Sequence, residues 1–184
     1  MKRQSGLASG SFLISWLLLG TTPAFAHQPV ILLPTDTTAI KGPLLTDGTI
    51  SFALRANFTK SGEKRGFRAV LKSGDKLKVE YLIFDKKPDN TYRSNQLPSL
   101  KIISPQGKSV IIQLNERTKF YEPFSKTNYL FLARYSEDAL PGVYEFLITS
   151  RGRANITISL GDKEISGEVI RVPVPTTSPS AQPT

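Results

Sequence analysis

Residues 76–84 read KLKVEYLIF, and this stretch decides the fold class. Apolar and charged side chains alternate along it. One face carries Leu77, Val79, Tyr81 and Ile83, and the other carries Lys76, Lys78 and Glu80. A period of two is typical of a β-strand that buries one face and exposes the other. The stretch therefore predicts a half-buried strand.

The same alternation recurs in several other segments of the chain. It predicts a core built from Ile50, Phe52, Leu54, Leu77, Val79, Tyr81, Ile83, Tyr144, Phe146, Ile148, Ile156 and Ile158. Turn-forming Gly, Pro and Asp residues separate the segments, and no useful window has the 3.6-residue apolar period of a helix. We predict an all-β fold: one antiparallel β-sandwich domain of jelly-roll or immunoglobulin-like type.

The first 26 residues have the organisation of a secretory signal peptide. Lys2 and Arg3 precede an apolar run, and Ala24-Phe25-Ala26 places small residues where a signal peptidase needs them. Cleavage after Ala26 would make His27 the first residue of the mature protein. We expect the sandwich to cover residues 27–172.

Composition at both ends fits an exported product. Residues 173–184 are rich in Pro, Ser and Thr and are predicted to be a disordered tail. The chain has no cysteine, which excludes disulfides and a lipid anchor on cysteine. No second apolar segment is long enough to span a bilayer after cleavage. The predicted location is secreted or in the cell envelope.

The charge balance favours anionic partners. Removal of Lys2 and Arg3 with the leader reduces the 24 basic residues to 22 against 15 acidic ones, a formal charge of +7. A positive surface attracts acidic envelope polymers or polyanionic glycans, although the same charge also keeps an exported domain in solution. The charges are scattered and no recognition helix is visible, so nucleic acid is not an expected partner.

The segment from Lys119 to Tyr135 concentrates aromatic side chains, with basic residues between them. Aromatic faces stack on sugar rings, and nearby cations hold acidic substituents. The candidate ligand-binding residues are Phe120, Tyr121, Phe124, Lys126 and Tyr135. The alternative is that Phe120, Tyr129 and Phe131 fill the core, which the alternation of Tyr129, Phe131 and Ala133 favours.

His27 is the candidate metal ligand, and copper is the candidate cofactor. A free N-terminal amine and the imidazole of the same residue can chelate one copper ion. Mature chains of exported copper oxygenases of polysaccharides and of small periplasmic copper carriers begin in the same way, and this chain resembles them in that one position. A carboxylate would have to complete the site, because the sequence has no second histidine. Otherwise His27 simply follows the cleavage site.

Sequence motifs for catalysis are scarce. There is no cysteine nucleophile, no GxSxG sequence and no phosphate-binding loop. A pair of carboxylates for glycoside cleavage stays open as a third hypothesis, because any two of the 15 acidic residues could meet in space. The sequence therefore favours a protein that is not an enzyme.

Two segments resemble exported bacterial β-sandwich modules. Residues 141–148 read PGVYEFLI, and residues 100–108 read LKIISPQGK, a strand that enters a Pro-Gly turn. Pre-peptidase C-terminal-like and related jelly-roll modules contain both kinds of segment. The resemblance implies a sandwich that assists secretion, adhesion or ligand binding without catalysis. The leading hypothesis is an exported, non-catalytic β-sandwich that binds a glycan or an anionic polymer, and the alternative is copper binding through His27.

Overall fold

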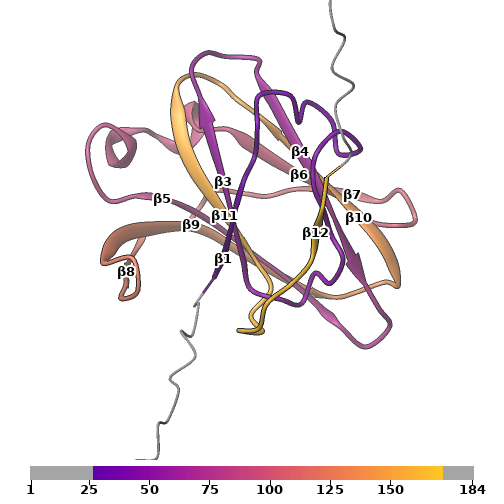
Figure 1. Cartoon of the computed structure of the whole chain (residues 1–184). Helices are drawn as coiled ribbons and strands as arrows, with labels where there is room; N and C mark the ends of the chain where they lie inside the picture. Colours follow the sequence, from indigo (N-terminus) through magenta and orange to yellow (C-terminus); the bar gives the residue numbers. More distant parts are fainter. Residues whose placement is uncertain (1–26, 172–184) are drawn as a thin grey trace, which may run out of the picture.

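The computed structural model describes residues 27–171 as two six-stranded sheets that face each other (Figure 1). The predicted signal peptide and tail lie outside these residues. Sheet A has the order β1 (Gln28–Ile31), β3 (Phe52–Phe58), β11 (Ala154–Leu160), β5 (Lys76–Phe84), β9 (Thr127–Asp138) and β8 (Thr118–Glu122). Sheet B has the order β12 (Val169–Ile170), β2 (Leu44–Leu45), β4 (Lys64–Leu71), β10 (Gly142–Thr149), β6 (Ser99–Ile103) and β7 (Ser109–Ile111). The all-β sandwich prediction is confirmed.

The main core lies between the sheets, and every residue predicted for it is buried there. Alternate residues of each strand point inward, as the period of two requires. On the sheet B side the rings of Phe67 and Phe146 stack with centroids 4.3 Å apart and planes within 2°. Since the chain has no disulfide, this buried apolar surface is what holds the fold.

The central strands pair antiparallel, whereas two N-terminal strands do not. β1 pairs with β3 in parallel, and β2 pairs with β4 in parallel, so both sheets are mixed. Parallel neighbours need a crossover connection. The chain supplies one because it leaves sheet A after β1, contributes β2 to sheet B and returns as β3.

Strand β9 carries a β-bulge that the sequence pattern did not reveal. Tyr81 pairs with Ala133 but Leu82 pairs with Phe131, so Leu132 is an extra residue. A bulge reverses which residues face inward. Leu132 and Ala133 both enter the main core, whereas Phe131 lies on the outer face of sheet A.

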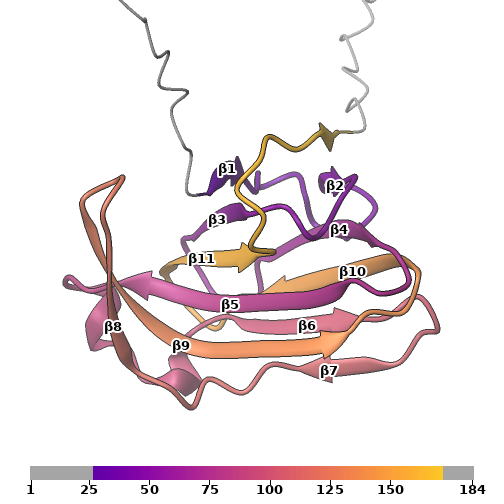
Figure 2. The ribbon, with the colours of Figure 1, turned by 90° about the horizontal axis from the view of Figure 1, so that it is seen from below.

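The alternative prediction, that Phe120, Tyr129 and Phe131 fill the main core, is therefore wrong. Tyr129 and Phe131 do not share a face with Ala133. Instead they form a second apolar cluster outside sheet A, with Leu82 and the half-buried Phe84 and Phe120. Figure 2 shows the reason in three dimensions: the β8–β9 hairpin turns out of the plane of the sheet and rises beside it.

Two short 3₁₀ helices, η1 (Asp89–Thr91) and η2 (Ser94–Gln96), interrupt the long polar loop after β5. Neither they nor any other helix within residues 27–171 has the length and apolar character needed to cross a membrane.

Candidate functional site

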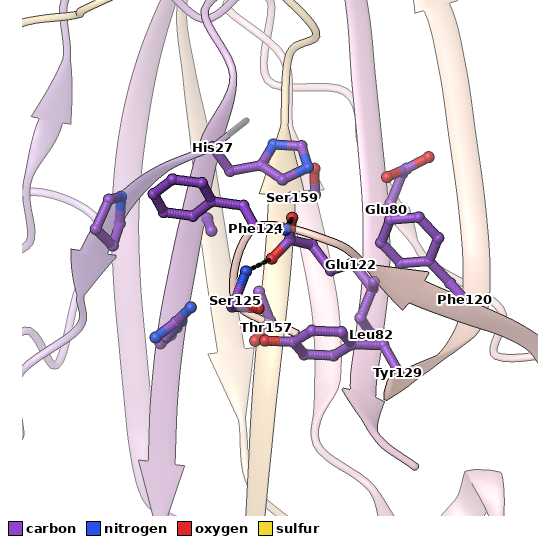
Figure 3. A pocket seen from close by; sticks show the side chains of 13 residues that line it. His27, Glu80, Leu82, Phe120, Glu122, Phe124, Ser125, Tyr129, Thr157 and Ser159 are labelled. Carbon is purple, nitrogen blue, oxygen red and sulfur yellow. Dashed lines mark hydrogen bonds between the residues drawn. The ribbon is translucent and has the colours of Figure 1, made fainter. Parts of the chain in front are cut away.

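A groove of about 190 Å³ opens on the outer face of sheet A, between β1 on one side and the β8–β9 hairpin on the other (Figure 3). It is lined by His27, Pro29, Ala53, Arg55, Glu80, Leu82, Phe120, Glu122, Phe124, Ser125, Tyr129, Thr157 and Ser159. Strands β3, β11 and β5 form its floor.

The floor consists of the outward-facing residues of three neighbouring strands. Ser159 lies opposite both Ala53 and Glu80, and Thr157 lies opposite both Arg55 and Leu82. Thr157 and Ser159 are buried although they are polar, and they belong to β11, the middle strand of the floor. Their short side chains leave the space that longer residues would fill.

The hairpin wall is held in place by the second apolar cluster. The rings of Phe120 and Phe131 have centroids 5.0 Å apart, and those of Phe84 and Tyr129 are 5.1 Å apart. The guanidinium of Arg134 lies 4.4 Å from the centroid of the Phe131 ring, in cation–π contact. These contacts fasten the hairpin to the sheet from which it rises.

Glu122 shapes the hairpin tip. Its side chain is buried, and its two carboxylate oxygens accept hydrogen bonds from the backbone N–H groups of Phe124 (2.9 Å) and Ser125 (2.6 Å). Burial raises the pKa of Glu122, but hydrogen bonds from Ser125 and Phe124, together with the nearby His27, outweigh it and lower the pKa below its ordinary value. The lowered pKa favours the ionised carboxylate. Its hydrogen bond holds the backbone of Phe124, whose ring lies at the edge of the groove (Figure 3).

Glu80 is the second carboxylate that lines the groove, and its environment raises its pKa, whereas that of Glu122 is lowered. Burial raises the pKa of Glu80, and the opposing influences of Arg134, His27 and Ser159 are too weak to reverse the change. Glu80 rises from the floor, and its carboxylate is available to accept a hydrogen bond from a ligand.

His27, the candidate metal ligand, lines the groove, and its ring has a protein partner. Its Nδ1 atom makes a hydrogen bond with the Ser51 hydroxyl. The next residue, Gln28, is anchored by two side-chain hydrogen bonds to the backbone of Gly167 (2.8 and 2.9 Å). Chelation of a metal by the amine and imidazole of one histidine uses Nδ1, so the ring would have to leave Ser51. Within residues 27–171, no three His, Asp or Glu side chains gather closely enough to hold a metal ion.

The predicted ligand-binding residues separate into two groups. Phe120 and Phe124 line the groove, on opposite sides of Glu122 in the hairpin. Tyr121 and Lys126 belong to the same hairpin and are exposed, but they do not line it. Alternation along β8 explains why Tyr121 does not line the groove although Phe120 does, since neighbouring residues of a strand face opposite ways.

Tyr135 lies beyond the bulge, away from the groove. It is half-buried against the main core, and its hydroxyl donates a hydrogen bond to a Glu137 carboxylate oxygen at 2.6 Å. Burial and this hydrogen bond raise the pKa of Tyr135 to about 12. The bulge therefore separates it from Phe120 and Phe124.

Sequence reasoning missed the charged residues of the groove, Arg55, Glu80 and Glu122. Their outward positions on alternating strands were visible for Arg55 and Glu80. What was not visible is that β3 and β5 are both neighbours of β11, and that a hairpin folds over that part of the sheet.

Comparison with known proteins adds no relative to this description. No protein-family model matches the chain, and no curated protein matches it either. The resemblance to pre-peptidase C-terminal-like modules therefore stays a prediction.

Proposed function

We propose that this protein is an exported, non-catalytic binding module whose groove holds one sugar unit of an envelope or extracellular glycan. The observation that carries the proposal is the pairing of an aromatic wall with a polar floor across a small groove. Sugar rings present apolar C–H faces and a rim of hydroxyl groups, so they need both kinds of surface.

The chemistry of the lining supports this ligand class. Phe120, Phe124 and Tyr129 offer aromatic rings for the apolar faces of a sugar. Glu80 and Ser159 offer hydrogen-bonding oxygens for its hydroxyl groups. The volume of about 190 Å³ lies below the range of roughly 300–1,000 Å³ usual for drug-sized ligands, and it suits a single ring.

The role of Glu122 favours binding over catalysis. Glycoside cleavage by a carboxylate pair needs one group to donate a proton and the other to attack or to activate water. Both oxygens of Glu122 already accept backbone hydrogen bonds that shape the hairpin tip. Glu80 would be left without a second carboxylate in the groove that is free to react.

Two exposed aromatic residues of one hairpin provide a matched test. Phe124 is 59% exposed and lines the groove, whereas Tyr121 is 54% exposed and does not. The residue 27–184 protein is screened on a glycan array, and the affinities of hits are measured by calorimetry. We expect Phe124→Ala to weaken binding at least about tenfold, the loss of roughly 1.4 kcal/mol of stacking, and Tyr121→Ala to leave it unchanged.

The outcomes separate the hypotheses. Equal losses in both variants, or no glycan hit at all, would reject the groove as a glycan site. Release of new reducing ends from a bound glycan would instead favour the carboxylate-pair enzyme.

Copper binding through His27 is the second candidate. His27 lines the same groove as Glu80 and Glu122, but within residues 27–171 these side chains do not gather closely enough to hold a metal by themselves, so the amine of a mature N-terminus would have to complete the site. Copper titration compares protein that begins at His27 with protein that carries one additional N-terminal residue. Tighter binding by the first would support chelation by the His27 amine, and equal affinity would remove His27 from consideration.

A further inference from the structure

Arg55 brings an unpaired positive charge to the floor of the groove. Its Nε–H is buried, and across residues 27–171 its guanidinium has no hydrogen-bond or ion-pair partner. Arg65 and Arg68 also have a buried, unpaired Nε, but their terminal nitrogens donate to backbone carbonyls of Lys64, Asn57 and Ile40. Of these three arginines, Arg55 is therefore the one whose donors remain for a ligand.

No acidic residue stands next to Arg55 in the sheet. Its cross-strand neighbours are Ile31 on β1 and Thr157 on β11. Glu80 is two strands away, about 9.5 Å across the sheet at the usual strand spacing. It also lies two residues further along the sheet, since Arg55 is level with Thr157 and Glu80 with Ser159. Glu122 is engaged by the hairpin tip. A partly buried guanidinium without an acceptor is unfavourable, so a bound anion would complete the site.

We propose, on the basis of the proposed glycan-binding function, that the sugar unit is acidic, a uronate whose carboxylate pairs with Arg55. A planar carboxylate matches the donor fork of a guanidinium and accepts two parallel hydrogen bonds. The ring of the sugar then lies toward the aromatic wall, and its hydroxyl groups reach Glu80 and Ser159. His27 is the other basic group that lines the groove.

A carboxylate suits the groove better than a phosphate does. Glu80 and Glu122 already place negative charge in the groove, and a phosphate dianion would add twice the repulsion of a carboxylate. The excess of basic over acidic residues in the chain attracts a polyanion from a distance. A polymer of uronate units combines long-range attraction with one negative charge at the site.

The test uses pairs of polymers that differ only in whether the carboxyl group is free or methyl-esterified, so the ester lacks the negative charge. Polygalacturonate, alginate and hyaluronan are each compared with their methyl ester, in binding experiments with the residue 27–184 protein at low and moderate salt. We expect at least one acid form to bind about tenfold or more tightly than its ester. Inorganic phosphate should compete no better than acetate at equal ionic strength.

Three variants locate the effect. Arg55→Gln should abolish the preference for the acid form while binding of the ester persists. Arg55→Lys keeps the positive charge but lacks the two parallel donors of a guanidinium, so it should retain a reduced preference for the acid form. Arg68→Gln is the control, since Arg68 also has an unpaired Nε but lies in sheet B outside the groove, and it should behave as the unmodified protein. Circular dichroism verifies that each variant is folded.

The failures of the two proposals are distinguishable. If acid and ester forms bind alike, or if Arg55→Gln keeps the preference in folded protein, the assignment of a uronate to Arg55 is wrong and glycan binding stands. The same conclusion holds if only neutral glycans bind, or if phosphate competes better than acetate. If no glycan of any charge binds, both proposals are overturned.

Discussion

Residues 27–171 form two apolar clusters, and the two clusters differ in what surrounds them. The main core is closed between two sheets, and Phe67 and Phe146 stack there without access to solvent. The outer cluster lies against the outer face of sheet A only, where Phe84 and Phe120 pack against Tyr129 and Phe131. The comparison indicates that the closed core supplies stability, while the outer cluster positions a wall of the groove.

The largest expected effect is the loss of a ring from the main core. Phe146→Ala should lower the free energy of unfolding by about 3–5 kcal/mol, because it removes a fully buried ring and leaves a cavity that the two sheets cannot close. Urea unfolding of the purified domain measures the change. An unchanged unfolding midpoint would contradict the assignment of Phe146 to the core.

A smaller effect is expected in the outer cluster. Phe131→Ala should cost about 2 kcal/mol, because the ring is buried but the site is open enough for the hairpin or water to fill the gap. Hydrogen exchange should accelerate in β8 and the first half of β9 and stay slow in β4 and β10. A loss as large as that of Phe146→Ala, with uniform acceleration of exchange, would show that the two clusters form one cooperative core.

The smallest effect concerns the hairpin tip and depends on pH. Because the pKa of Glu122 is lowered in the folded protein, its contribution is complete above its ordinary value of 4.5 and is lost as the pH falls through the lower folded value. Glu122→Gln should therefore cost about 1 kcal/mol at pH 7, from weaker hydrogen bonds to Phe124 and Ser125, and less below pH 4.5. Urea midpoints across the pH range measure the difference.

Glu80 provides the control for this prediction. Its pKa is raised in the folded protein, so its contribution is complete below the ordinary value of 4.5 and is lost as the pH rises through the higher folded value. Glu80→Gln should not destabilise the domain at pH 7. If both variants showed the same dependence on pH, the opposite environments assigned to the two carboxylates would be wrong.

Only part of the candidate site could be predicted from the sequence, and individual residues show why. Phe120 and Phe124 could be named as candidates because their aromatic cluster is visible in the linear sequence, and both line the groove. Tyr135 belongs to the same cluster in the sequence but not in space, because the bulge at Leu132 lies between them. Arg55 was not singled out, because the absence of a partner becomes visible only when its neighbours are known.

The sequence by itself determined the fold class, the core and the inward face of most strands. This was possible because the two-residue period of a strand is a local property, which each segment carries independently. Only the tertiary structure decided which strands are neighbours, where β9 changes face and which residues meet in the groove. Those features depend on pairing between segments such as β5 and β9, which are far apart in the chain, and one extra residue in such a pair reverses every side chain beyond it.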